Sequence, residues 1–260
     1  MIVVIIQARM GSTRLPGKVL MNLAGKPVLW HIITRIQRAT HLDIICVATT
    51  IENEDDRIEE ACRMWNIPVC RGSHDDVLSR YYECVKRIGM QGSKEDYIVR
   101  ITADCPFVDP EIVDNLIENA IRGNYDYVSN IDPPTFPDGL DVEVIRFDVL
   151  EIAVKEARLN SEREHVTPYI RKNKAFLKFN YARIPDLSNI RLTLDTCEDY
   201  QMIAMIYDTL YHEGDIISLK DILKLLDSRS DILAINDQYK RNEGYEKSLS
   251  QDRIIGGDLE

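Results

Sequence analysis

The chain is short of positive charge and of cysteine patterns. It has 32 Lys and Arg residues against 43 Asp and Glu residues, a formal net charge of −11. Because such a chain repels polyanions, we expect neither a nucleic-acid nor an anionic-membrane partner. Its six cysteines are scattered without a C-x-x-C pair, a pattern that indicates neither a zinc site nor a disulfide framework. Free cysteines are typical of a reduced cytoplasm.

Long apolar runs are missing as well. No run approaches the roughly 18–20 residues that a transmembrane helix needs. The apolar start has no basic segment before it and ends in a charged loop after residue 6, so we expect no signal peptide and a cytoplasmic protein. No internal repeat and no low-complexity linker divides the 260 residues. We therefore predict one large α/β domain, residues 1–231, followed by a polar tail, residues 232–260.

What the chain does have is a strong signal at its beginning. Residues 2–6 are a continuous β-branched run, typical of a strand that is buried on both faces in a parallel sheet. Residues 7–18 then hold two glycines, two hydroxyl side chains, two arginines and a lysine. Glycines let backbone amides approach phosphate oxygens closely, and the cations neutralise phosphate charge. We interpret this segment as a phosphate-binding loop; the alternative is an ordinary connection with surface arginines.

The loop does not follow the common phosphate-binding patterns. From Gly11, a Walker A loop would need its second glycine where Pro16 stands, and Lys18 is followed by Val19 rather than by Ser or Thr. The G-x-G-x-x-G pattern is absent too. The sequence Q-A-R-M-G-S-T-R-L-P-G-K-V-L instead resembles the nucleotide-binding loop of the bacterial sugar cytidylyltransferases, which include the acylneuraminate and 3-deoxy-octulosonate cytidylyltransferases. Within this family, the loop sequence most resembles that of the SpsF-type branch of spore-coat polysaccharide biosynthesis.

Apolar strands alternate with amphipathic helices along most of the chain. This alternation implies a parallel sheet with right-handed crossovers. The resemblance implies a single Rossmann-like, GT-A-like nucleotidyltransferase domain, with a mostly parallel central sheet and helices on both faces. We predict strands at residues 43–49, 67–70, 97–101, 126–130, 139–145, 174–181 and 190–194, and helices that begin at residue 26 or cover residues 54–65, 109–122 and 148–159. We expect Asn53 to cap the second helix and the acidic first turn of that helix to be solvated.

A second segment of the family resemblance is R-G-S-H-D-D-V-L-S-R-Y, residues 71–81. It is similar to the family segment that lies near the bound nucleotide. The resemblance makes Arg71, Ser73 and Arg80 candidates for nucleotide binding. From the residues alone, the same stretch is a strand end, a loop and a helix cap. We expect His74 to be a surface loop residue.

Two aspartates carry the metal hypothesis. Asp104 follows a buried strand, at the edge where open α/β sheets bind ligands; an Asx-turn is the structural alternative. Asp195 follows another alternating run and is not needed for the capping box that Thr196 and Asp199 predict. Both match the magnesium-binding aspartates of the family, the second in L-D-T-C-E-D, where the family usually has Pro in place of Cys197. Carboxylates suit one octahedral Mg²⁺ that is shared with phosphate oxygens.

Acceptor candidates lie further along the chain. Alternation puts Asp141 and Glu143 on one strand face, which is an exposed polar face, a wall for the acceptor sugar or a second acidic contact to the metal. His165 would position or deprotonate an acceptor hydroxyl, or pack near a subunit interface. The segments D-G-L-D-V-E-V, R-E-H-V-T-P-Y and R-N-E-G-Y-E-K-S-L resemble the SpsF-type branch. The last of them would lie over the site or over a partner subunit.

The resemblance implies a magnesium-dependent cytidylyltransferase. It would join CTP to a small acidic sugar, nonulosonate-like or octulosonate-like, to give a CMP-sugar and pyrophosphate for bacterial surface polysaccharide biosynthesis, and it would be a homodimer. Lys18, Arg14 and Arg9 would be catalytic and, with Mg²⁺, would spread the charge of the leaving pyrophosphate. The nucleotide-binding set comprises Ala8, Arg9, Gly11, Ser12, Arg14, Lys18, Arg71, Ser73, Arg80, Thr102 and Asp104.

Three other functions stay open at this point. The first is cytidylyl transfer to a phosphate or phosphonate acceptor. The second is a non-catalytic nucleotide-binding subunit of polysaccharide assembly, against which both aspartates and Lys18 count. The third is a glycosyltransferase, which more often has a D-x-D pair where this chain has Asp104, Cys105 and Pro106.

Overall fold

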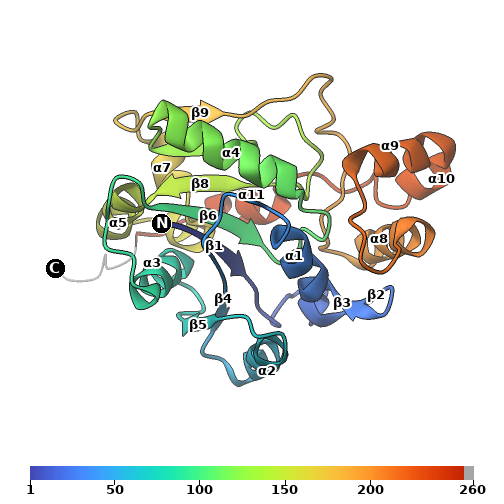
Figure 1. The fold of residues 1–260 in the computed structure, drawn as a ribbon, viewed down its shortest axis with the longest axis horizontal. Helices are drawn as coiled ribbons and strands as arrows, with labels where there is room; N and C mark the ends of the chain where they lie inside the picture. Colours follow the sequence, from blue (N-terminus) through green and yellow to red (C-terminus); the bar gives the residue numbers. More distant parts are fainter. Residues whose placement is uncertain (255–260) are drawn as a thin grey trace.

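The apolar run at the start of the chain forms β1 (Ile2–Gln7), a central strand of the sheet (Figure 1). In the computed structural model, which describes residues 1–254, seven strands form one sheet in the order β5-β4-β1-β6-β8-β7-β9. β1 pairs in parallel with β4 (Ile44–Thr50) and with β6 (Tyr97–Thr102). β1 thus has a strand on each side. Both of its faces also pack against apolar cores, as its unbroken β-branched sequence predicts.

The other strands of this sheet include one reversal. β5 (Val69–Gly72) continues the parallel half beyond β4. β8 (Glu143–Arg146) runs antiparallel between β6 and β7 (Tyr127–Ser129), and β9 (Lys178–Asn180) pairs in parallel with β7. The sheet is therefore mostly parallel, and the predicted Rossmann-like α/β fold is confirmed. A separate hairpin of β2 (Asn22–Leu23) and β3 (Lys26–Pro27) precedes the first helix.

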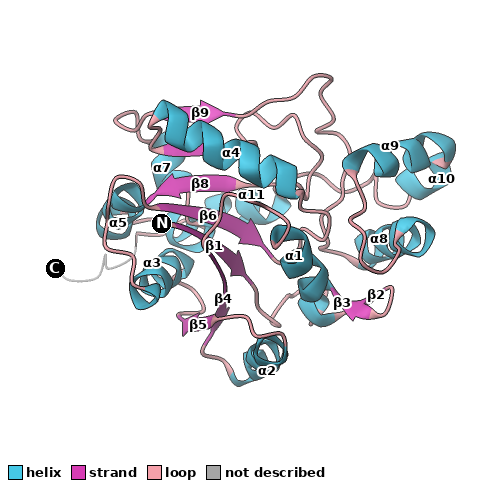
Figure 2. Ribbon diagram, in the orientation of Figure 1, coloured by secondary structure: helices cyan, strands magenta, loops and turns pink. Residues whose placement is uncertain are grey.

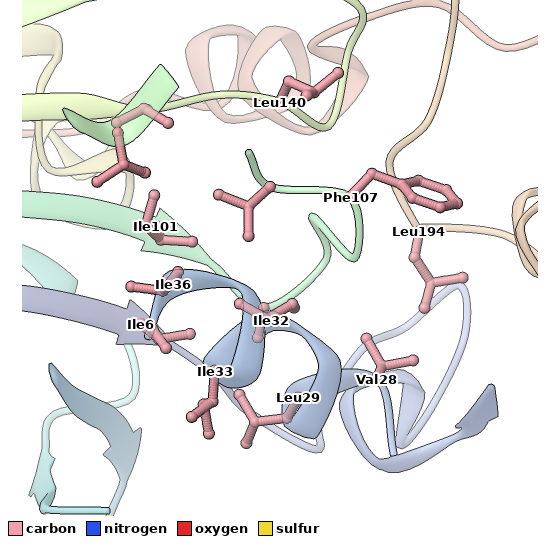
Figure 3. Close-up of a cluster of buried hydrophobic side chains, with 14 of the residues drawn as sticks. Ile6, Val28, Leu29, Ile32, Ile33, Ile36, Ile101, Phe107, Leu140 and Leu194 are labelled. Atoms are coloured by element: carbon pink, nitrogen blue, oxygen red, sulfur yellow. The ribbon is translucent and has the colours of Figure 1, made fainter. Parts of the chain in front are cut away.

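Helices surround the sheet and cover both of its faces (Figure 2). Alternate residues of β1 enter two cores: Ile6 packs in one core with Ile32, and Val3 packs in the other with Leu78. Figure 3 shows part of the first core, where the apolar side chains of one helix meet Ile6. Each such fully buried side chain contributes about 1.5–3 kcal/mol. The helices are α1 (Val28–Ile36), α2 (Asp56–Met64), α3 (Val77–Ile88), α4 (Pro110–Gly123), α5 (Phe147–Glu156), α6 (Asn160–His165), α7 (Pro168–Lys172), α8 (Cys197–Leu210), α9 (Leu219–Ser228), α10 (Ser230–Leu233) and α11 (Glu243–Ser250).

The acidic segment before α2 differs from the prediction. A 3-10 turn (Asn53–Asp55) precedes the helix, and Asn53 makes no capping hydrogen bond. Asp55 is only 1% exposed, and its carboxylate accepts hydrogen bonds from the Met10 amide at 2.6 Å and the Thr50 amide at 3.2 Å. The expectation of a solvated acidic turn is therefore wrong for Asp55, because this carboxylate ties the loop after β1 to the end of β4.

The predicted strand at residues 190–194 is also wrong. Within the described part of the chain, this segment has only an isolated bridge between Asp138 and Arg191. The Asp138 amide donates to the Ile190 carbonyl at 2.9 Å, and the Leu192 amide donates to the Asp138 carbonyl at 2.7 Å. The alternation reflects a segment that buries apolar side chains while its backbone pairs with a loop rather than with the sheet. The predicted third strand, residues 67–70, is shifted to β5.

Three of the scattered cysteines meet in the core between the sheet and α3. The Cys46 sulfur lies 3.7 Å from the Cys70 sulfur and 3.4 Å from the Cys84 sulfur, and all three thiols are free. Their positions in the sequence show no metal-ligand spacing, so only the fold reveals the cluster. The expectation that the chain holds no zinc stays a prediction.

The predicted tail lies partly outside the described residues, because the structure describes the chain only as far as residue 254. Of the part described, α10 and α11 are helical. The boundary at residue 231 stays a prediction. Across residues 1–254, none of the helices combines the length and the apolar composition that a membrane span requires.

Candidate active site

A cavity of about 700 Å³ opens where β1 and β6 end. This is the edge at which open α/β sheets bind ligands. Its walls come from segments that are far apart in the sequence: the loop after β1, the end of β6, β8, the α6–α7 region, the segment before α8, and α11. Side chains that line it and that carry the argument below are Arg9, Ser12, Arg14, Lys18, Arg100, Thr102, Asp104, Asp141, Glu143, His165, Arg171, Arg191, Asp195, Glu243 and Tyr245.

Lys18 joins the two aspartates at one end of this cavity. Its ammonium lies 3.1 Å from Asp104 Oδ2 and 2.8 Å from Asp195 Oδ1, and it donates to the Leu194 carbonyl at 2.8 Å. Burial by itself would lower the pKa of Lys18, but the two carboxylates outweigh it and the pKa is raised. The two acids predicted to share a metal are thus brought to the same place, with an ammonium between them.

Asp104 is held in its charged form. Burial would raise the pKa of Asp104, yet Lys18 and the Thr102 hydroxyl, which donates to Asp104 at 2.5 Å, lower it to about 2. Carboxylate oxygens gathered beside a phosphate-binding loop are the donors that Mg²⁺ takes together with substrate phosphates. The donor set of Asp104 and Asp195 therefore fits this metal.

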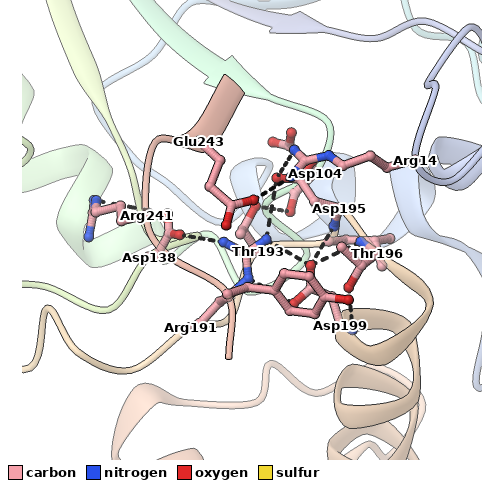
Figure 4. Close-up of polar contacts among 12 residues, drawn as sticks. Arg14, Asp104, Asp138, Arg191, Thr193, Asp195, Thr196, Asp199, Arg241 and Glu243 are labelled. Atoms are coloured by element: carbon pink, nitrogen blue, oxygen red, sulfur yellow. Dashed lines mark hydrogen bonds and ion pairs between the residues drawn. The ribbon is translucent and has the colours of Figure 1, made fainter. Parts of the chain in front are cut away.

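Two arginines surround Asp195 (Figure 4). Arg14 lies 2.9 Å from its Oδ2 atom, and Arg191 lies 3.4 Å from the same oxygen. Arg191 also pairs with Asp138 at 3.1 Å and with Asp199 at 2.8 Å. Asp199 is fully buried and completes the predicted capping box at the start of α8. Arg191 therefore fixes the segment on which Asp195 stands.

The sequence analysis missed Arg191. The available signal was its position as the one cation in an otherwise apolar and hydroxyl-bearing run just before Asp195, residues 190–194. A lone charge in such a run is buried and needs an acidic partner.

Part of the predicted nucleotide loop faces the cavity. Arg9, Ser12, Arg14 and Lys18 line it. The Arg9 guanidinium contacts the His74 ring nitrogen at 3.2 Å, so His74 has a role in holding Arg9 as well as a partly exposed position.

Two other residues of the same loop, Ala8 and Gly11, lie outside the cavity lining. The Ala8 amide donates to the Ala48 carbonyl at 3.1 Å, so this amide is already bonded within the sheet edge. Gly11 lies against Glu54, whose Oε1 atom would be 2.6 Å from an added Cβ. A side chain at position 11 would therefore displace the end of the exposed Glu54 side chain.

The second family segment reaches the cavity through Val77, whereas Arg71 and Ser73 are not part of the cavity lining. The Arg71 guanidinium is bound to Asp56 at 2.5 Å, to Glu59 at 2.9 Å and to two backbone carbonyls. The Ser73 hydroxyl accepts the Asp76 amide at 3.0 Å, just before α3. The positions of Arg71 and Ser73 give the predicted nucleotide contact no support, because the guanidinium and the hydroxyl are bonded to partners within the protein.

Arg80 completes this segment and is 1% exposed. Its Nη1 atom donates to the Ser73 carbonyl at 2.7 Å, and its aliphatic stem packs on Gly72. Arg80 therefore supports the loop from below rather than lining the cavity. Two of its guanidinium nitrogens, Nε and Nη2, are buried without a hydrogen-bond partner among the described residues, and the nucleotide contact of Arg80 stays a prediction.

Glu143 and Asp141 lie on the cavity side of β8 and the loop before it. Glu143 is 1% exposed, pairs with Arg100 and accepts the Tyr127 hydroxyl at 2.6 Å. Burial would raise the pKa of Glu143, but Arg100 outweighs it and the pKa is lowered. Asp141 pairs with Arg241, while burial raises its pKa to about 7. The alternative of an exposed polar face is wrong for Glu143, and the acceptor wall and the second metal contact stay predictions.

His165 forms a wall of the cavity beside α11. Its Nε2 atom lies 2.9 Å from the Ser248 hydroxyl, and its ring meets the Tyr245 ring edge-on with centroids 5.1 Å apart. Burial lowers the pKa of His165 to about 4, so the imidazole is neutral near pH 7. The structure therefore places this side chain at the cavity, within one chain.

The segment around α11 covers the cavity, which is one of the two positions predicted for it. Arg241 pairs with Asp141 and donates to the Phe136 carbonyl at 3.1 Å. Glu243 lies 3.1 Å from Arg14 (Figure 4). The segment is thus bonded both to the phosphate-binding loop and to the acceptor side.

Comparisons with known proteins agree with this geometry. A family model described as cytidylyltransferase matches residues 3–247. The chain is 39% identical to an uncharacterized protein of Methanocaldococcus jannaschii, over 92% of this chain and 96% of that one. It is 34% identical to the spore coat polysaccharide biosynthesis protein SpsF of Bacillus subtilis, over 88% and 95% of the two chains.

More distant relatives and a solved structure extend this result. A 3-deoxy-manno-octulosonate cytidylyltransferase of Anaeromyxobacter dehalogenans is 35% identical over 45% of this chain and 46% of that one. The solved structure of a cytidylyltransferase from Leptospira borgpetersenii is 32% identical, with a TM-score of 0.83 over 92% of this chain and 98% of that one. Because the family model and two relatives span nearly the whole chain, the protein belongs to the cytidylyltransferase family, as the resemblance of its loop predicted.

Proposed function

We propose that this chain transfers the cytidylyl group of CTP to a small acidic sugar, with Mg²⁺, and produces a CMP-sugar and pyrophosphate for surface polysaccharide synthesis. The observation that carries the proposal is the cluster of Lys18 with Asp104 and Asp195 at the phosphate end of the cavity. The SpsF-like relative supports the polysaccharide role, and the octulosonate-type relative supports an acidic sugar.

The chemistry is one displacement at phosphorus. The acceptor oxygen bonds to the α-phosphorus while the bond from that phosphorus to the bridging oxygen breaks, so negative charge grows on the departing pyrophosphate. Arg9, Arg14 and Lys18 line the cavity where this charge would develop. Fixed cations in a partly buried site stabilise such charge without reorganising, and losing one costs on the order of 10²–10³ in rate.

Asp104 and Asp195 would hold Mg²⁺. When bound, this ion supplies further charge stabilisation to the phosphate oxygens. In the protein itself, Lys18 lowers the pKa of Asp104 and keeps this carboxylate ionised, which is the form that a metal needs. Arg191 keeps Asp195 in place through Asp199.

The test is a pyrophosphate-release assay with each of the four nucleoside triphosphates against a panel of sugar acids, sugar phosphates and phosphonates. We expect release only with CTP, Mg²⁺ and a sugar acid, and loss of release in D104N and D195N. D227N is the matched control, because Asp227 is exposed on α9, away from the cavity. Release with a phosphate or phosphonate instead would support that alternative acceptor, and full activity of both cavity variants would refute the metal assignment.

A non-catalytic nucleotide-binding subunit is excluded by the same assay if any acceptor is turned over. CTP binding without turnover, seen as a rise in melting temperature with CTP alone, would favour it. We also propose a homodimer, which light scattering coupled to gel filtration will test.

A further inference from the structure

One arginine of the cavity stands apart from all the others discussed above. Arg171 lies on α7 and lines the cavity, yet its guanidinium forms no ion pair and no hydrogen bond within residues 1–254. Its Nε atom is buried without a partner. An unpaired buried N–H group costs free energy, and the two Nη atoms of the same guanidinium are neither buried nor hydrogen-bonded within residues 1–254, so these two donors are open to a ligand.

The neighbours of Arg171 hold it in position. Its guanidinium carbon lies 5.4 Å from the centroid of the Tyr245 ring, a distance typical of a cation–π contact. Tyr245 belongs to α11, which also packs against α6. The Tyr245 ring, held in place by the packing of α11 against α6, therefore orients the guanidinium without occupying its hydrogen-bonding groups.

The charges that act on Arg171 include two carboxylates, Glu143 and Asp132, but neither forms an ion pair with it within residues 1–254. Arg100 is neutralised by its ion pair with Glu143, the carboxylate whose charge also acts on Arg171. His165 is neutral near pH 7, since burial lowers its pKa to about 4. The nearby charged groups at the rim, Glu164 and Lys247, have opposite signs.

We propose that Arg171 is the acceptor-recognition residue and binds the carboxylate of the acidic sugar. This inference rests on the proposed function and adds to it the group that selects the acceptor. A planar guanidinium matches a planar carboxylate through two parallel hydrogen bonds. A carboxylate monoanion suits this position better than a phosphate dianion, because Glu143 and Asp132 repel a second negative charge.

Arg183 provides a matched control. It too has a buried guanidinium nitrogen without a partner and lies over an aromatic ring, 5.8 Å from the centroid of Phe136. It differs from Arg171 in not lining the cavity. Any effect of R171Q that R183Q does not share therefore comes from the cavity and not from the loss of a half-buried arginine.

The experiment first identifies, with the unaltered protein, which sugar acid of the panel gives pyrophosphate release. That acid and its C1 amide are then compared in the wild type, R171Q, R171K and R183Q. We expect R171Q to lower kcat/KM for the acid on the order of ten- to a hundredfold, mainly through KM, with the KM for CTP unchanged. The amide should be a poor substrate for the wild type and R183Q, and R171Q should no longer distinguish acid from amide, while R171K recovers part of the preference.

The outcome separates this inference from the proposed function. If R171Q prefers the acid over the amide as strongly as the wild type does, the inference is overturned although the proposed function stands. If the wild type turns over none of the acids, the proposed function fails, and Arg171 is judged by calorimetric titration of 3-deoxy-manno-octulosonate and N-acetylneuraminate. Binding by the wild type that R171Q loses supports the inference; equal binding by both, or none by the wild type, overturns it.

Discussion

Replacing Lys18 with methionine tests the centre of the site most directly. Methionine keeps the length of the side chain but removes the charge between Asp104 and Asp195. The pKa of Asp104, about 2 in the wild type against an ordinary value of 3.8, should then rise. A shift of this size corresponds to about 2 kcal/mol of stability at pH 7.

The sign of this contribution fixes how it changes with pH. A carboxyl group whose pKa is lower in the folded than in the unfolded protein stabilises the fold above its unfolded pKa. That stabilisation is lost as the pH falls towards the folded pKa. For Asp104, the loss occurs between about pH 4 and pH 2. We therefore expect K18M to be less stable than the wild type at pH 7 by about 2 kcal/mol, with about half of the difference gone at pH 3.

Urea denaturation at pH 7 and pH 3 measures this difference, and the pyrophosphate assay measures activity in the same variant. Activity should fall by about 10²–10³. K220M, which alters an exposed lysine at the start of α9, is the control and should behave like the wild type in both assays. Equal stability of K18M and wild type at pH 7, with parallel changes down to pH 3, would show that the ammonium does not hold Asp104 in its ionised form.

Three smaller predictions concern the cavity rim. E243Q should change stability by less than about 1 kcal/mol in thermal unfolding, because its partner Arg14 is partly exposed; a larger loss would contradict the weak pairing expected of surface charges. H165Q should show the same pH dependence of kcat/KM between pH 6 and 8 as the wild type, because the pKa of His165 lies near 4; an inflection lost with the histidine would refute this. R241Q should increase proteolysis within residues 240–250, since Arg241 bonds to Asp141 and Phe136; an unchanged cleavage rate would show that other contacts hold the segment.

The place of Asp104 follows from features that a sequence displays, whereas Asp195 stands outside the sheet and lies beside Asp104 because the Leu194 amide donates to the Asp104 carbonyl at 2.8 Å. The strand before Asp104 is a neighbour of β1 in the sheet, and parallel strands bring their carboxyl ends to one edge. No sequence pattern predicted the direction in which the Lys18 side chain points. Its ammonium lies between the aspartates because the 3-10 turn that contains it (Lys18–Leu20) points the side chain across the cavity, a property of tertiary packing.

The prediction for Arg71 shows what a sequence motif does not reveal. A motif records which residues travel together, but it does not say which of them touch the ligand. The partners of Arg71 are Asp56 and Glu59, in a helix that the sequence analysis treated as independent of residues 71–81. Only the docking of α2 beside β5 shows that the guanidinium is already bound.

The segment after α10 illustrates why polarity alone is an ambiguous signal. A run such as residues 239–249 has a polar composition, from which we predicted a polar tail that lies over the site or over a partner subunit. Glu243 and Tyr245 line the cavity, where they contact Arg14 and Arg171, and Arg241 beside them pairs with Asp141. These contacts reach both ends of the cavity. Because the segment is bonded to the phosphate-binding loop through Glu243 and to the acceptor side through Arg241 and Tyr245, we expect binding of CTP and binding of the acceptor to influence each other through it.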